Sequence, residues 1–171
     1  MAKNIDLISY PFLDEDFGST DHEVLSDFLS SVLGRILSMD TPLYEETFWL
    51  MEMALHLNGS VRGRIAVTEA DIDRGLSMLS KYRENNKDRL SGFVLPTGCR
   101  LACEYHIARG EAKKVSRNLH LVRNSGIKVD EILIDFIDLM TNILFVFSLE
   151  INRLNDIDEK VFISKSYGKF K

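Results

Sequence analysis

The sequence predicts an all-α protein: a bundle of five main helices with ferritin-like up-and-down packing and an arm at each end. Three observations lead to this prediction. Apolar residues recur at spacings of three and four over most of the chain. All three prolines fall between these periodic segments, where they would interrupt a helix at a cost of about 3 kcal/mol. No stretch alternates apolar and polar residues for long enough to require a sheet.

The first two helices lie in the N-terminal half of the chain. The first is predicted by the apolar spacing of residues 24–36, and Thr20 or Asp21 is expected to cap it. The second is predicted over residues 44–57, since Pro42 precedes it and Asn58-Gly59 ends it.

The third and fourth helices are marked by their boundaries. Thr68 and Asp71 resemble a capping box, which opens a helix that carries apolar residues as far as Tyr82. The fourth helix is expected to begin after Pro96 and to run to about Val122, before an Asn-Ser-Gly break.

The fifth helix is the most apolar segment, from about residue 129 to 152. Its stretch 132–151 is about as long as a membrane-spanning helix. A buried core helix is the better interpretation, because each acid at mid-membrane depth would cost about 2.5–3.5 kcal/mol. The polar residues that interrupt the stretch are Asp135, Asp138, Asn142 and Glu150.

Size and composition favour one globular domain over residues 1–171. The chain has 171 residues, of which 45% are hydrophobic and 27% charged, enough for one core without disulfides or structural metals. The arms are expected at about residues 1–20 and 160–171, the second as a flexible, lysine-rich tail.

Charge and cysteine content narrow the classes of partner and location. A net charge of −5 argues against a protein that neutralises many nucleic-acid phosphates. Cys99 and Cys103 are the two cysteines, so a disulfide framework is excluded and a reducing cytoplasm is the simplest location. The N-terminus turns acidic where a signal peptide would be apolar, so neither export nor a membrane partner is predicted.

The predicted fourth helix has one basic face. Arg109, Lys113 and Arg117 recur every four residues, with Lys114 beside them, so their side chains would lie one above another. Such a row attracts an anion, and guanidinium groups suit phosphate, so a triphosphate is the natural ligand. The alternative is the ordinary solvated face of a surface helix.

The predicted fifth helix carries a matching polar stripe of Asp135, Asp138 and Asn142. These side chains could meet the basic face, and Asp27 on the first helix is a further candidate partner. A carboxylate can fix the position of a partly desolvated arginine. The alternative is that all of these residues are exposed, which is the commoner state for acids.

A third cluster, Cys99, Cys103 and His106, would lie on one side of the fourth helix. Thiolates and imidazole can bind zinc, but a structural zinc site usually has a fourth ligand and a cysteine pair on a loop. Buried cysteines commonly act as small hydrophobic residues. We therefore predict no metal site here.

These residues stand in segments that resemble the PduO-type ATP:cob(I)alamin adenosyltransferases. The stretch FVLPTGCRLACEYHIARGEAKKVSRNL is similar to the family's F-x-L-P-G-G, L-H-x-A-R and R-R-x-E-R motifs in order. SDFLSSVLGRI resembles its V-D-E-L-N-S-x-L-G helix, VTEADIDRGLSML its I-T-E-E-D-V segment, and DFIDLMTNILFVFS its N-R-L-S-D-x-L-F helix. The resemblance covers about residues 25–152 without a break in order.

The resemblance implies a five-helix bundle that forms a homotrimer, with ATP and corrinoid at the subunit interfaces. Family members transfer the adenosyl group of ATP, used with Mg2+, to the cobalt of cob(I)alamin and release triphosphate. Arg109 and Asp27 match an intersubunit ion pair. Phe93 matches a phenylalanine that packs beneath the corrin ring, favours loss of the lower axial ligand and makes cobalt easier to reduce. The nucleotide or corrinoid site would include His106, Lys113, Lys114, Arg117, Asp138 and Asn142.

The sequence also departs from the family pattern. Lys113 and Lys114 stand at arginine positions and Ser116 at a glutamate position. The N-terminal T-G-D-x-G-x-T loop, which wraps the triphosphate, has no counterpart. The sequence is therefore compatible with two functions. The protein is either a divergent corrinoid adenosyltransferase or a non-catalytic homologue that binds corrinoid or nucleotide as a trimeric module.

Overall fold

The computed structural model describes residues 4–15, 18–90 and 92–166. Five α-helices make up most of this part of the chain, with two short 3-10 helices, η1 (Ile5–Leu7) and η2 (Lys87–Arg89). Val94 and Val161 form the one antiparallel β-bridge among the described residues, which contain no longer strand. The α-helices are α1 (Gly18–Leu37), α2 (Tyr44–Ser60), α3 (Glu69–Asn85), α4 (Arg100–Asn124) and α5 (Glu131–Leu154).

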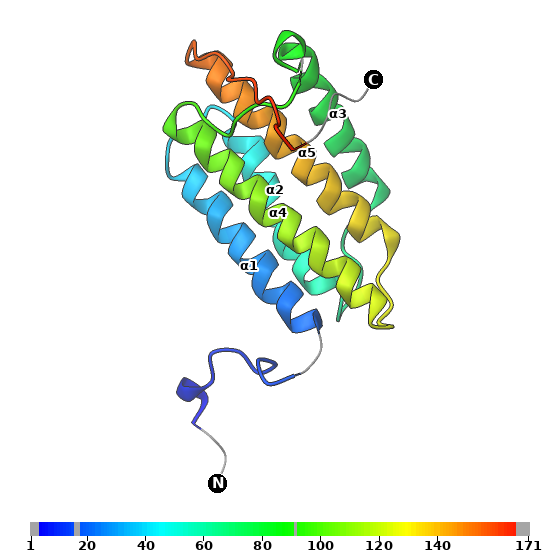
Figure 1. The fold of residues 1–171 in the computed structure, drawn as a ribbon. Coiled ribbons are helices and arrows are strands. Elements are labelled where there is room, and N and C mark those ends of the chain that lie inside the picture. Colours follow the sequence, from blue (N-terminus) through cyan, green and yellow to red (C-terminus); the bar gives the residue numbers. More distant parts are fainter. Residues whose placement is uncertain (1–3, 16–17, 91, 167–171) are drawn as a thin grey trace.

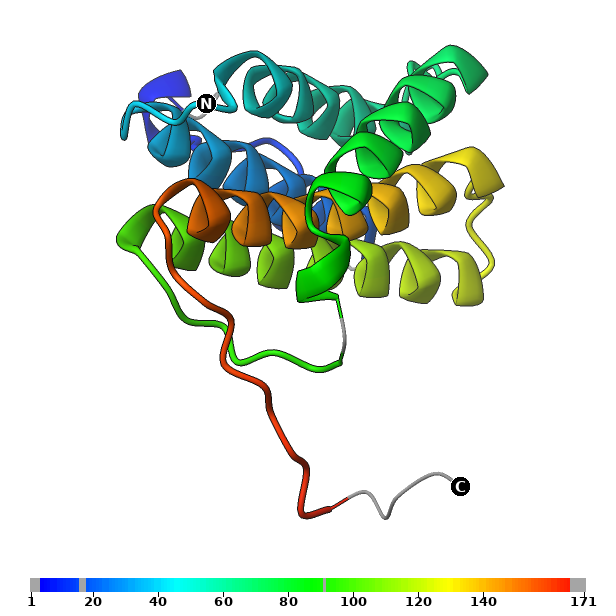
Figure 2. The same ribbon diagram turned by 90° about the horizontal axis from the view of Figure 1, so that it is seen from above.

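The helices pack as an up-and-down bundle around α5 (Figure 1). Helix α4 packs against both α5 and α1, while α2 packs on α1 and α3 on α5. Figure 2 shows α1, α4 and α5 side by side when the bundle is seen from above. Consecutive helices run in opposite directions along the bundle (Figure 1), and the longest of their connections, residues 86–99, joins α3 to α4.

Helix α5 is the core helix of the bundle. It is long and apolar enough to cross a membrane, but 72% of its most apolar 18-residue window is buried by the other helices. The ring of Phe147 meets those of Tyr82 and Tyr105 edge-on, at centroid distances of 5.0 and 5.6 Å. This burial confirms the prediction of a core helix.

The helix boundaries follow the sequence closely in the middle of the chain. Helix α3 begins with the predicted capping box, in which the Thr68 backbone N–H donates to the Asp71 carboxylate at 2.9 Å. The expected cap of α1 is wrong. The helix begins at Gly18, so Thr20 and Asp21 lie within its first turn. The Thr20 hydroxyl donates instead to the carbonyl of Phe12, at 3.1 Å.

Arg62, which follows α2, binds the N-terminal arm to α1. Its guanidinium lies 2.7 Å from the carboxylates of both Glu15 and Glu23, and it donates to the Thr20 hydroxyl at 2.8 Å. The same guanidinium lies over the Phe12 ring, 4.4 Å from its centroid. The described arm is thus fixed to the bundle where α1 starts.

The C-terminal segment returns along the loop that precedes α4. The Leu95 N–H donates to the Lys160 carbonyl and the Phe162 N–H to the Phe93 carbonyl, both at 2.7 Å. The flexible tail was predicted from about residue 160, and its residues 167–171 lie outside the described part.

Candidate functional site

The basic face predicted on the fourth helix lies along α4. The Arg109 guanidinium is half-buried against α5, 4.6 Å from the Phe145 ring centroid. Lys113 and Arg117 are exposed, and both border a groove of about 320 Å³ between α1 and α4. The groove is also bordered by Leu25, Lys114, Asn118 and Leu121.

Among the described residues, no carboxylate pairs with Arg109, Lys113 or Arg117. Lys114 does have a partner, the Glu111 carboxylate at 2.8 Å. Three of the four cations are therefore without a carboxylate partner in the part of the chain that the structure describes. Side chains with uncompensated charge attract an anion.

Burial and the charge of Arg109 both lower pKa values along α4. Burial, and then the charge of Arg109, lowers the pKa of His106 to about 4, so this imidazole is neutral at neutral pH. Burial also lowers the pKa of Arg109. The charge of Arg109, and then burial, lowers the pKa of Lys113. Neither ring nitrogen of His106 has a hydrogen-bond partner among the described residues.

The polar stripe of α5 does not pair with the cations of α4. Asp138 accepts a hydrogen bond from the Ser116 hydroxyl at 2.6 Å, while Asp135 and Asn142 are exposed. The proposed meeting of acids and cations within one chain is therefore wrong. Ser116, which stands at a glutamate position of the family motif, thus joins α4 to α5 through a hydroxyl–carboxylate hydrogen bond.

Asp27 lies on α1 and makes no ion pair within the described residues. It borders a cavity of about 450 Å³ that the N-terminal arm helps to enclose. The arm contributes Ser9, Tyr10 and Leu13 to this cavity. Asp27 and Arg109 are consequently both without an ion-pair partner in ranges 4–15, 18–90 and 92–166 of the single chain.

Phe93 lies in the loop before α4, and 82% of its surface is exposed. Ile163, two residues after the bridge, is 84% exposed. The residue bonded to Phe93 across the bridge is Phe162, which is 48% exposed, so exposed apolar side chains gather where the two segments meet. Phe93 and the basic row of α4 come from different elements.

Cys99 and Cys103 are free thiols at the start of α4. In the described ranges 4–15, 18–90 and 92–166, no three His, Cys, Asp or Glu side chains gather in an arrangement that could hold a metal ion. The Cys103 thiol lies 3.9 Å from the Gly98 carbonyl.

Sequence reasoning missed Phe145 and Glu111 as neighbours of the basic row. Phe145 belongs to the continuous apolar pattern of α5, and nothing in that pattern marks it as the residue beneath Arg109. Glu111 precedes Lys114 by three residues, a spacing that favours a helical ion pair and could have identified it.

No family model matches the sequence, and no curated protein sequence matches it. Solved structures do match. An arginine-to-lysine variant of a PduO-type ATP:co(I)rrinoid adenosyltransferase from Lactobacillus reuteri, complexed with ATP, superposes with a TM-score of 0.76. The alignment covers 86% of this chain and 88% of that one at 16% identity. The fold is that of the PduO-type adenosyltransferases.

Two further Lactobacillus reuteri structures of PduO-type ATP:corrinoid adenosyltransferase, both complexed with cobalamin and ATP, agree with this. A phenylalanine-to-alanine variant has a TM-score of 0.75 at 14% identity, covering 87% of this chain and 88% of that one. A phenylalanine-to-histidine variant has a TM-score of 0.73 at 14% identity, covering 85% and 83%. The sequence prediction of this fold is therefore confirmed, and identity this low leaves function to be argued from the site.

Proposed function

We propose that the protein is a corrinoid adenosyltransferase that moves the 5′-deoxyadenosyl group of ATP to cob(I)alamin. The Co(I) electron pair would attack C5′ of ATP. The Co–C bond would form as the C5′–O bond breaks, and triphosphate would leave with the bonding electrons. Such a reaction needs positioning and charge compensation rather than acid–base catalysis.

The observation that carries this proposal is the uncompensated row of cations on α4. Arg109, Lys113 and Arg117 have no carboxylate partner among the described residues, and the charge of Arg109, with burial, lowers the pKa of Lys113. A bound triphosphate would relieve this repulsion, and its charge would be greatest once it has left C5′. The row would then stabilise the leaving group more than the substrate. Asp138 and Asn142 would border the nucleotide with its Mg2+.

The unpaired state of Asp27 supports an assembled site. We infer that the protein works as a homotrimer in which Asp27 of one subunit pairs with Arg109 of the next. A half-buried guanidinium without a partner is costly, and a carboxylate from a neighbouring subunit would compensate it. ATP and corrinoid would bind between subunits, in the cytoplasm.

Phe93 is the residue that we propose for the lower face of the corrinoid. Its exposed ring would occupy the place of the lower axial ligand. Four-coordinate Co(II) would then be reduced more readily to the Co(I) nucleophile. His106, which is neutral and has free nitrogens, would lie close to Arg109 on the nucleotide side.

An anaerobic assay with reduced cobalamin, ATP and Mg2+ tests the function by the absorbance change of the cobalt–carbon bond. We expect Arg109→Ala to lower kcat/KM by roughly 10²–10³-fold, because a cation aimed at the developing charge is lost. Arg123→Ala is the matched control. Arg123 also lies on α4, but it pairs with Glu131 at 2.7 Å, away from the row.

Two outcomes would contradict this proposal. An unchanged rate in Arg109→Ala would show that Arg109 does not have the role that the family resemblance implies. Measurable corrinoid or ATP binding by the wild type, with no product above the protein-free rate, would favour the alternative function of a trimeric binding module without turnover.

A further inference from the structure

The loop that presents Phe93 is held by a network centred on one buried residue of α5. We call residues 89–99 the Phe93 loop, of which residue 91 lies outside the described part, and residues 157–163 the strap. The strap is the C-terminal segment that runs beside this loop in both views of the fold (Figures 1 and 2). Asn152, near the end of α5, contacts both.

Both the oxygen and the nitrogen of the Asn152 side-chain amide are hydrogen-bonded. The amide oxygen accepts from the Cys99 N–H at 3.2 Å, and the amide nitrogen donates to the Thr97 carbonyl at 3.0 Å. The same nitrogen donates to the Glu159 carboxylate of the strap, also at 3.0 Å. Asn152 is fully buried, so these bonds do not compete with water.

The loop backbone is shaped to receive this side chain. Gly98 has φ +137°, in the region that favours glycine, and a Cβ built there would lie 1.9 Å from the Asn152 amide oxygen. Glycine therefore permits both the backbone conformation and the close approach. The loop end at residues 97–99 is fixed directly on α5.

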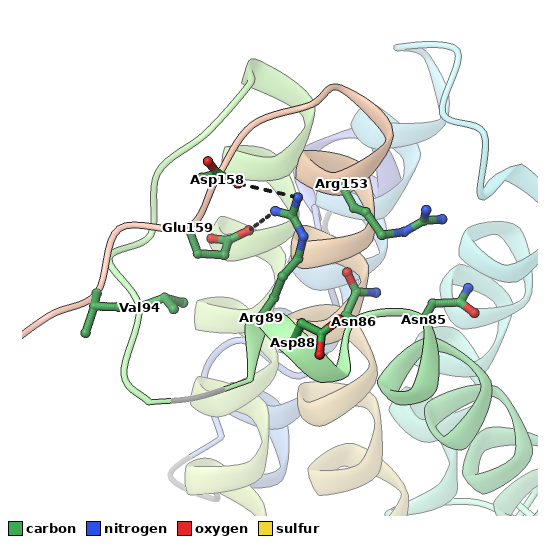
Figure 3. Close-up of a pocket in the computed structure, with 9 residues that line it drawn as sticks. Asn85, Asn86, Asp88, Arg89, Val94, Arg153, Asp158 and Glu159 are labelled. Atoms are coloured by element: carbon green, nitrogen blue, oxygen red, sulfur yellow. Dashed lines mark ion pairs between the residues drawn. The ribbon is translucent and has the colours of Figure 1, made fainter.

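The strap carries the restraint to the other end of the loop. Arg89, where the loop begins, donates to the Ile157 carbonyl at 2.6 Å and lies 3.7 Å from the Glu159 carboxylate. Figure 3 shows Arg89 pointing between Asp158 and Glu159 of the strap. Burial raises the pKa of Glu159, which agrees with a carboxyl held away from water.

The middle of the loop is bound to the strap by backbone bonds on either side of Val94. The Phe93 carbonyl accepts from the Phe162 N–H, and the Leu95 N–H donates to the Lys160 carbonyl. The ring of Phe93 makes no bond of its own and is 82% exposed. Its position is consequently set by the backbone of the strap.

We propose that Asn152 is the positioning residue for Phe93, acting through Glu159 and the strap. This inference rests on the proposed function for the role of Phe93. Removing the Asn152 amide would release both Thr97 of the loop and Glu159 of the strap from α5, because no other described side chain bonds to both. Phe93 would then sample many positions instead of one.

Amide hydrogen exchange of the full-length protein tests the coupling without any corrinoid. In Asn152→Ala, we expect the Leu95 and Phe162 amides to exchange at least about tenfold faster, while core amides of α5 stay protected. Asn155→Ala is the matched control. Asn155 lies one turn on, and its side chain donates only to the Ile151 carbonyl within α5. Unchanged exchange at Leu95 and Phe162 would overturn the inference.

Glu159→Ala is a second variant, since its side chain belongs to the strap and not to the helical core. It removes the bond from Asn152 to the strap and the ion pair of Glu159 with Arg89, while leaving Thr97 and Cys99 bonded to Asn152. We expect the same faster exchange at Leu95 and Phe162. Protection equal to wild type in both variants would contradict a role for this network.

Activity then separates positioning from general stability. We expect Asn152→Ala to lower kcat and the amount of four-coordinate Co(II) on the enzyme, with KM for ATP unchanged. The Phe93→Ala/Asn152→Ala double variant should match Phe93→Ala within about twofold, because one residue acts through the other. Additive losses would overturn the positioning role. If the wild-type protein does not bind corrinoid, the proposed function is wrong. The hydrogen-exchange experiment uses no corrinoid, so its test of the Asn152 network would still hold.

Discussion

Tyr105 shows how a single buried residue joins two helices of the bundle. The side chain is fully buried, and its hydroxyl bonds to Thr41 at 2.8 Å and to Thr47 at 2.7 Å. Burial raises the pKa of Tyr105 to about 12, so the hydroxyl stays protonated at neutral pH. This one group ties α4 to the start of α2.

Tyr105→Phe should lower the free energy of unfolding by roughly 1–3 kcal/mol, because two buried threonine hydroxyls lose their partner. Urea denaturation followed by circular dichroism measures the loss. Tyr44→Phe is the control, since Tyr44 is 48% exposed, and its effect should stay within about 0.5 kcal/mol. Equal effects in the two variants would contradict the importance of the buried hydroxyl.

His106 should make stability depend on pH. Its pKa is about 4 in the fold against 6.5 in an unfolded chain. Unfolding therefore takes up a proton between these values, and the free energy of unfolding falls as pH drops from 6.5 towards 4. The contribution is fully present above 6.5 and has been lost below 4.

His106→Gln should reduce this slope, measured by urea denaturation at pH values across the window and at one above it. Part of the slope should remain, because burial also lowers the pKa of His22. The comparison is between slopes, so a pH-independent change in stability does not affect it. Identical slopes in wild type and variant would show that His106 is not held neutral by the fold.

At the scale of elements, the sequence predicts what local chemistry determines. The capping box of α3 is one such case, because Thr68 and Asp71 are close in sequence and bond directly. The start of α1 was misplaced, because Thr20 and Asp21 look like caps in isolation. The Thr20 hydroxyl contacts Phe12 and Arg62, which only the folded arm brings near.

In the candidate site, too, features within one helix were predictable and contacts between helices were not. The row on α4 was predictable, because its spacing of four is a property of one helix. The contact of Arg109 with Phe145 and the bond of Ser116 to Asp138 join two helices, and the spacing within each helix does not fix their register. Asn152 was missed for that reason, since its partners lie about 55 residues earlier, at Thr97 and Cys99.

Asp71→Ala should lower the free energy of unfolding by about 1 kcal/mol through loss of the capping box. The Asp71 carboxylate accepts from both the N–H and the hydroxyl of Thr68, so one substitution removes two bonds. Asp73→Ala on the same helix is the control, since Asp73 is exposed and makes no ion pair among the described residues. A loss of equal size in Asp73→Ala would show that the effect comes from removing a negative charge near the start of the helix and not from the capping box.

For the whole molecule, the decisive prediction is the homotrimer, in which we propose that Asp27 of one chain pairs with Arg109 of another. Light scattering should give three times the 19.6 kDa mass of the chain. Val24 and Phe28 lie one turn apart on α1 beside Asp27, and both are about half exposed, at 49% and 52%. Interfaces of stable oligomers bury such apolar side chains at their centre.

Phe28→Asp should therefore shift the assembly from trimer towards monomer without unfolding the bundle, because a charge would be buried in the interface. Leu76→Asp is the matched control. Leu76 is 51% exposed on α3, a helix that packs on α5 and not on α1, so this variant should stay trimeric. If wild type is a monomer, Asp27 and Arg109 cannot form one site. If both variants dissociate equally, the interface does not lie on the α1 face.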